Sequence, residues 1–238
     1  STGVNIMSFE DKKYSLETAE TINDVWNNPV TKTLVNACKF LAPLSDVIEN
    51  GIGKLIAEHQ KKKLEELLEA ILSDGMITTQ QVEDVTVIME FAKMVDVVNR
   101  LASNDKIKYL GNLFKNTIKS NEINFVEYEE FLAKINDLSY RELDIIKILY
   151  EVQKNNSLGI IGKCTENEVG FNPADTWNLF VKEAKQIMGL TEGEITAIVS
   201  GIMRSGFVQY IPINYAIGIK GVYVTTPYFE KFLKTITE

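Results

Sequence analysis

Residues 191–226 read TEGEITAIVSGIMRSGFVQYIPINYAIGIKGVYVTT, and this stretch decides the fold class. Thr191 and Glu194 form a capping box, a hydroxyl residue followed three positions later by glutamate, which begins a helix. Isoleucine and valine then recur at helical spacing. Two runs rich in β-branched and aromatic residues follow, at 207–213 and 221–226, and these predict β-strands. The stretch therefore predicts a helix followed by a β-hairpin.

The flanking sequence adds further helices on both sides of this unit. Ser139 and Glu142 form a second capping box upstream. Pro173 suits the first position of another helix, because its fixed backbone angle matches that position. Residues 214–220 connect the two predicted strands, and Pro227 starts a last amphipathic helix. The predicted order is helix, helix, helix, hairpin, helix.

That order, over residues 138–238, resembles a winged helix-turn-helix domain. In DNA-binding members of the family, the outward face of the third helix enters the major groove. The residues expected on that face are Glu192, Gly193, Thr196, Ala197, Ser200, Gly201 and Arg204, with Lys220 in the wing. Arg204 is the only positively charged residue on the helix face. Contacts to DNA phosphates and bases need several Arg, Lys, Asn or Gln side chains. We therefore predict an interaction face of Glu192, Thr196, Ser200, Arg204 and Lys220 that contacts protein rather than DNA.

The preceding part of the chain, residues 15–137, predicts a helical bundle. Apolar residues there recur every three or four positions, and no alternating strand pattern competes. The charged stretch 59–63 interrupts one apolar stripe and predicts a bend or a change of packing surface. Residues 1–14 are predicted to be a flexible tail or an appended remnant, with Met7 as a candidate natural start. The fold class is thus mainly α, a bundle followed by a winged-helix-like α+β domain.

Composition restricts the partners. The chain has 25 Lys+Arg against 33 Asp+Glu, a net charge of −8, which repels polyanions and disfavours DNA. No uncharged apolar run reaches the roughly 18 residues of a membrane span, and no secretory leader pattern is present. Cys38 and Cys164 have no partner at metal-ligand spacing and are expected to be free thiols. We therefore predict a cytoplasmic protein without stable membrane insertion.

Motifs that carry chemistry are incomplete. His59 is the only histidine, so a histidine-based triad or a multi-histidine metal site would have to use it or fail. We expect His59 to be an ordinary, partly buried histidine on a helix surface. Phosphate-loop fragments at 51–54 and 159–164 each lack the first glycine and the final Ser or Thr. The calcium-loop fragments at 74–78 and 123–128 lack oxygen ligands at the required positions. The sequence predicts no catalytic, cofactor-binding or metal residue, no cofactor and no enzyme.

A second resemblance covers the whole chain. The Leu-rich segment Tyr109–Phe114, together with the winged-helix-like end, is similar to uncharacterised bacterial helical proteins linked to abortive phage infection. We predict a non-enzymatic interaction or regulatory protein with a protein partner or as a homodimer. One alternative is a DNA-binding transcriptional regulator with a helical sensing body. The third is a phage-defence accessory or membrane-acting protein, acting through the apolar stretch 34–56.

Overall fold

A computed structural model describes residues 25–41, 51–101, 103–120, 124–155, 173–215 and 218–237. In this part of the chain, helices predominate and two strands form one antiparallel sheet, which confirms the mainly helical class. The elements are α2 (Pro29–Leu41), α3 (Gly51–Leu72), α4 (Thr79–Val82), α5 (Val85–Arg100), α6 (Ile107–Lys119), α7 (Phe125–Asp137), α8 (Tyr140–Asn155), α9 (Pro173–Met188), α10 (Glu192–Ile202), the 3₁₀ turn η1 (Met203–Ser205), β1 (Val208–Tyr215), β2 (Gly218–Thr225) and α11 (Pro227–Thr237).

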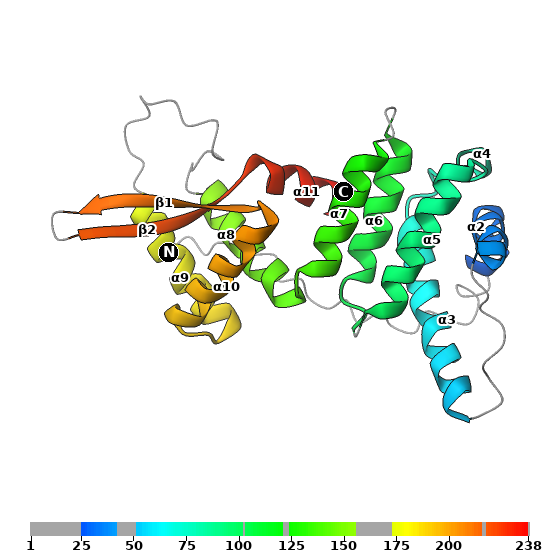
Figure 1. The fold of residues 1–238 in the computed structure, drawn as a ribbon, viewed down its shortest axis with the longest axis horizontal. Helices are drawn as coiled ribbons and strands as arrows, with labels where there is room; N and C mark the ends of the chain where they lie inside the picture. Colours follow the sequence, from blue (N-terminus) through cyan, green and yellow to red (C-terminus); the bar gives the residue numbers. More distant parts are fainter. Residues whose placement is uncertain are drawn as a thin grey trace.

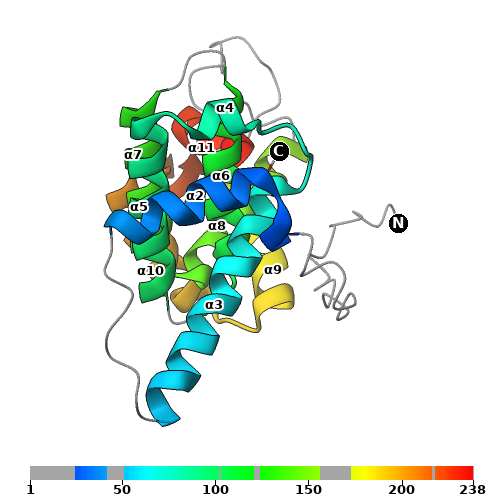
Figure 2. The same ribbon diagram turned by 90° about the vertical axis from the view of Figure 1, so that its right-hand side faces the viewer.

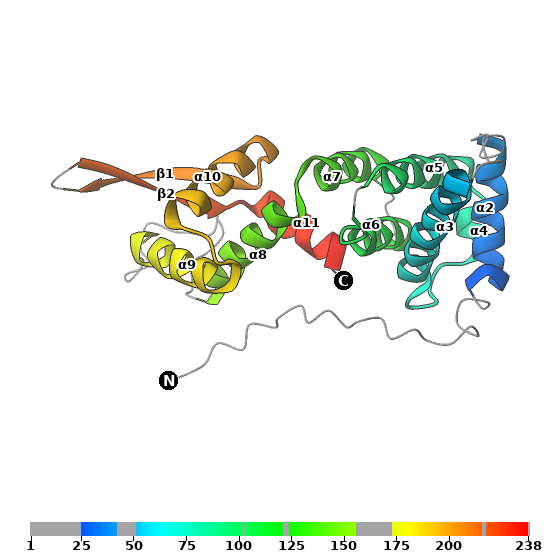
Figure 3. The same ribbon diagram turned by 90° about the horizontal axis from the view of Figure 1, so that it is seen from below.

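The described elements form an elongated molecule (Figure 1). The β1–β2 hairpin projects at one end beside α8, α9 and α10, and α2 lies at the other end, as the view from below also shows (Figure 3). Helix α2 lies across that end, where it contacts α4 and α5 (Figure 2). Helix α11 leaves the hairpin and returns to α6. One continuous set of buried apolar side chains therefore extends from α2 to α11.

Helix α6 is central, since α3, α5, α7 and α11 all pack against it. Its buried residues include Leu110, Leu113 and Phe114. The ring of Phe114 lies between those of Phe91 and Tyr128, with centroids 5.5 and 6.2 Å away. Such tilted and edge-on contacts suit the charge distribution of aromatic rings. Burial on several sides explains why α6 carries few exposed positions.

Polar side chains of α6 join the end of the chain to the bundle. Asn112 donates to the carbonyl of Ile236 at 3.0 Å, and Asn116 donates to that of Thr235 at 2.8 Å. These carbonyls belong to the last turn of α11, where helical partners are lacking. The two asparagines therefore hold α11 against α6 by satisfying its C-terminal end.

Lysine side chains donate hydrogen bonds to the C-terminal carbonyls of other helices in the same way. The amine of Lys63 donates to the carbonyl of Leu101 beyond α5, and Lys106 donates at 2.7 Å to the carbonyl of Ile135 in α7. A cation at a helix C-terminus also matches the negative end of the helix dipole. Lys63 is buried, and α3 continues as one helix through residues 59–63.

Most local signals at the C-terminal part are confirmed. Both bonds of the Thr191–Glu194 capping box are present, as are those between Ser139 and Glu142. Gly206 follows η1 with a φ of 77°, the left-handed conformation that glycine adopts readily. The strands, however, extend into the predicted connection 214–220, because Tyr215 still pairs with Gly218 in the register. Backbone pairing continues there without needing a pattern of side chains.

A few predictions fall partly outside the described residues. Residues 15–24 of the predicted bundle lie there, as do the side chain of Cys38 and the whole of Cys164. Within the described ranges, none of the helices has both the length and the apolar character that crossing a bilayer requires. Residues 42–50 of the apolar stretch 34–56 are outside those ranges.

Candidate functional site: the outward face of helix α10

The predicted interaction residues follow one ridge of the third C-terminal helix. Glu192, Thr196 and Ser200 recur every fourth position on α10, and Arg204 continues the spacing in η1. Glu192 and Ser200 are exposed and Thr196 is partly exposed. The backbone of Lys220 lies in β2, and its side chain is outside the described residues. The structure thus places four of the five predicted residues in a row.

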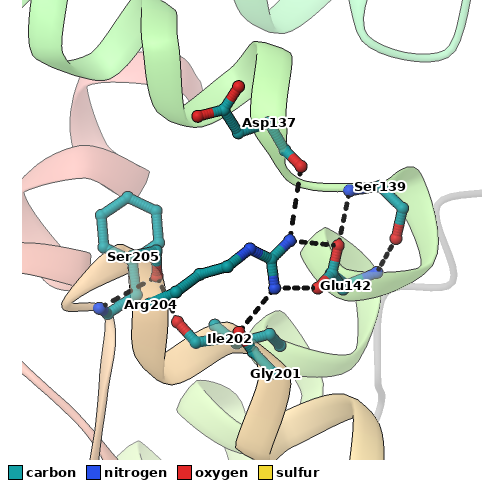
Figure 4. A network of polar contacts seen from close by, with 8 residues as sticks. Asp137, Ser139, Glu142, Gly201, Ile202, Arg204 and Ser205 are labelled. Carbon is teal, nitrogen blue, oxygen red and sulfur yellow. Dashed lines mark hydrogen bonds and ion pairs between the residues drawn. The ribbon is translucent and has the colours of Figure 1, made fainter.

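The side chain of Arg204 turns away from this ridge toward the start of α8 (Figure 4). Its two terminal nitrogens donate to the two carboxylate oxygens of Glu142 at 2.7 and 3.1 Å, a bidentate pair. The same guanidinium donates to the carbonyls of Gly201 and, at 3.4 Å, of Asp137. Arg204 therefore fastens η1 to the junction between α7 and α8.

This pairing keeps both partners charged. The hydrogen bond that Arg204 donates to Glu142 raises the pKa of Arg204. Burial alone would raise the pKa of Glu142, but the hydrogen bonds from Arg204 and Ser139 outweigh it and lower that pKa below its usual range. The positive charge of Arg204 is balanced within the molecule, so it contributes little attraction for an external phosphate.

The start of α10 is acidic. Glu192 is exposed there, and hydrogen bonds from the backbone amide and the hydroxyl of Thr191 lower the pKa of Glu194. Both carboxylates lie in the first helical turn. The predicted resemblance to winged-helix domains would place this end of the helix next to DNA bases. Negative charge at that end opposes a phosphate backbone.

Small residues border the ridge. Gly193, Ala197 and Gly201 recur at every fourth position of α10, and all three are exposed. A Cβ added at Gly193 would meet no atom within 4 Å, and one at Gly201 would meet the Arg204 side chain at an ordinary 3.5 Å. Small side chains let another backbone approach a helix closely. Along α10 itself, the face is therefore neutral to acidic and consists mainly of small side chains.

Replacing Arg204 with alanine is expected to lower the free energy of unfolding by about 0.5–1 kcal/mol at neutral pH, because the pair is bidentate but half exposed to water. A carboxyl group with a lowered pKa in the folded protein stabilises it above the pKa of the unfolded chain, near 4.3. That stability is lost as the pH falls through the lower pKa of folded Glu142. The difference between Arg204→Ala and wild type should thus shrink below about pH 4, as urea unfolding at several pH values would show.

Lys182→Ala is the matched control, because Lys182 is an exposed cation on α9. Its unfolding curve should follow wild type at every pH. A deficit for Arg204→Ala that stays constant down to acid pH would contradict the role assigned to Glu142.

A polar depression of about 450 Å³ lies where α6, α7 and α11 meet. The polar side chains that line it already form hydrogen bonds or ion pairs with neighbouring residues. Asn116 donates to the backbone of α11, Glu127 pairs with Lys231, and Lys119 pairs with Asp74 at 2.8 Å. These contacts indicate a seam between packed helices rather than a prepared ligand site.

Sequence patterns predicted only part of the contacts around Arg204. The capping box identified Glu142 as a helix start but gave no sign of Arg204, which lies 62 positions away. His59 is exposed on α3, as a helix-surface histidine should be.

In comparisons with known proteins, no family model, no curated protein and no solved structure matched the chain. The resemblances to winged-helix domains and to phage-linked helical proteins therefore stay predictions.

Proposed function

We propose that this chain is a non-enzymatic interaction protein, in which the winged-helix-like part formed by α8 to α11 contacts another protein through the outward face of α10. The observation that carries the proposal is the pairing of Arg204 with Glu142. It neutralises within the molecule the only basic side chain that the sequence offered on the helix itself. The exposed residues along α10 are small or acidic, including Ala197, Ser200 and Glu192.

Charge supports protein contact over nucleic acid. Affinity for DNA begins with phosphate neutralisation by several cations, and the whole chain has a net charge of −8. Lys182 and Lys185 are exposed on α9, near Glu192, where they line a shallow hollow of about 270 Å³. The adjacent carboxylate offsets their attraction for phosphate. A neutral face of small residues instead permits close approach of a helix or strand from a partner.

DNA binding is tested first. Labelled duplex DNA, including the region upstream of the gene, is titrated with protein at low and near-physiological salt while fluorescence anisotropy is recorded. We expect no salt-sensitive binding, even at low salt where the phosphate contribution is largest. Salt-sensitive binding that is weakened in Lys182→Ala or Lys185→Ala would overturn the proposal in favour of the DNA-binding regulator.

Protein contact is tested by incorporating a photo-crosslinking amino acid at position 197, in place of Ala197, and irradiating the cells that naturally make the protein. The control position is Lys62, an exposed residue of α3. We expect a discrete adduct from position 197 and none of that size from position 62. An adduct of twice 26.9 kDa would identify a second copy of this chain as the partner.

The crosslinked partner is then purified and its affinity measured with unmodified protein. Ala197→Trp should weaken binding by at least tenfold, because a large side chain blocks close approach, whereas Lys62→Ala should leave it unchanged. Equal affinity for wild type and Ala197→Trp would show that α10 does not form the contact.

A further inference from the structure

Large apolar side chains are exposed where α5 and α7 begin. Val126 is 71% exposed, Val85 is 70% exposed and Met89 is 50% exposed, which places them among the most exposed large hydrophobic residues of the described chain. Single apolar residues on a surface are normal, whereas a group of them marks a contact surface. The arrangement of α5 and α7 decides whether these three form such a group.

Helices α5 and α7 lie side by side in one layer, with α3 and α6 in the next layer (Figure 3). Both begin at the same end of the bundle (Figure 1), and Lys93 on α5 pairs with Glu129 on α7. One turn before this pair, α5 carries Met89 and α7 carries Val126. One further turn back, α5 carries Val85. The three apolar residues therefore form one surface, the α5–α7 patch.

Carboxylates surround the α5–α7 patch. Glu83 and Asp84 directly precede α5 and are exposed, as are Glu129 and Glu130 in the second turn of α7. Within one turn of the patch along the described parts of these two helices, Lys93 is the only cation. The apolar surface thus has an acidic border.

Lys93 is already shared between two carboxylates. Its amine lies 2.8 Å from Oε1 of Glu90 and also pairs with Glu129. The hydrogen bond to Glu129, and then that to Glu90, raises the pKa of Lys93 and keeps the amine charged. The other carboxylate oxygen of Glu90 is buried, and no group in the described part of the chain donates to it. Negative charge near the patch therefore exceeds the positive charge that the molecule supplies there.

We propose that the α5–α7 patch binds a helix of a partner protein that has apolar residues on one face and lysine or arginine beside them. This surface is a second contact and is independent of the α10 face. Val85 and Met89 are one turn apart, a spacing that matches apolar positions on another helix. The basic residues of the partner complement the carboxylates and select it over acidic helices. A second copy of this chain is disfavoured, because two acidic borders would face each other.

The test uses the full chain and two labelled helical peptides that share leucines at every third or fourth position. One peptide carries lysine at its remaining positions and the other carries glutamate. Fluorescence anisotropy should show micromolar binding of the lysine peptide and about tenfold weaker binding of the glutamate peptide. No binding of the lysine peptide would overturn the proposal, and equal binding of both would overturn the role of charge.

Variants locate the binding surface. Met89→Ser should weaken the lysine peptide about tenfold, since it removes an apolar contact at the centre of the patch. Ile187→Ser should not weaken it, although Ile187 on α9 is equally exposed, at 51%. Glu83→Gln should weaken binding about threefold at low salt and less at high salt, whereas Glu58→Gln, at an exposed position of α3, should have no effect. Equal effects of Met89→Ser and Ile187→Ser would overturn the assignment of the site.

Sedimentation of the chain alone tests the other occupant of this surface. We expect no self-association that depends on Met89. Concentration-dependent dimers that Met89→Ser abolishes would identify a second copy of the chain as the occupant and overturn the proposed partner.

Discussion

Replacing Phe207 with alanine is expected to lower the free energy of unfolding by about 3–5 kcal/mol. The side chain is fully buried at the start of the hairpin. Its ring centroid lies 4.6 Å from that of Phe232 and 5.4 Å from those of Tyr228 and Phe229, all on α11. Truncation would leave a cavity that these rings cannot fill without losing their own contacts. Urea denaturation followed by circular dichroism would measure the loss.

Tyr210→Ala is the control for this change, since it also removes an aromatic ring from the hairpin. The Tyr210 side chain is 41% exposed and contacts Tyr223 across the strands with ring centroids 5.4 Å apart. Removing the Tyr210 ring should lower the free energy of unfolding by only about 1 kcal/mol, because folding buries little of its apolar surface. Equal losses for Phe207→Ala and Tyr210→Ala would mean that the contact between hairpin and α11 is not a packed core.

Replacing Gly111 with alanine is expected to destabilise the protein by about 1–3 kcal/mol, although alanine favours helices. Gly111 lies where α6 crosses α3. A Cβ at this position would come within 2.5 Å of the Cβ of Ala70 and 3.2 Å of the carbonyl oxygen of Leu67. Both atoms belong to, or sit directly on, the backbone of α3 and cannot rotate away. The two helices would have to separate.

The matched control is Gly193→Ala in α10, where the added methyl group meets no atom within 4 Å. This substitution should stabilise the protein by about 0.5–1 kcal/mol through helix propensity alone. The double variant Gly111→Ala with Ala70→Gly moves the methyl group to the opposite helix and should recover much of the loss. A double-mutant cycle would measure the coupling. Additive effects at the two positions would show that the helices do not touch there.

Sequence patterns predicted the helices well because their signals are local. The capping boxes at 139–142 and 191–194, Pro173 and Pro227 each act within one helical turn, and the structure confirms every one of these helix starts. The hairpin was also predicted, but its strands extend further than expected. Residues 214–215 and 218–220 pair through backbone groups that any sequence supplies.

The candidate site was predicted only in part. Helical spacing placed Glu192, Thr196 and Ser200 on one ridge, as the structure shows. The orientation of Arg204 could not follow from spacing, because a long side chain selects among partners that only the folded chain brings near. Glu142 is such a partner, and it is part of a capping box as well as of the ion pair.

Local sequence determines where α8, α10 and α11 begin, because the hydrogen bonds that start a helix join residues three or four positions apart. Tertiary structure alone decided that α11 returns to α6, where the side-chain amide of Asn112 donates to the carbonyl of Ile236, 124 positions away. It likewise brought Arg204 to Glu142 and Lys147 to Tyr109. Such pairs form because packing of the apolar faces fixes the positions of the helices, and polar groups buried by that packing must then find partners.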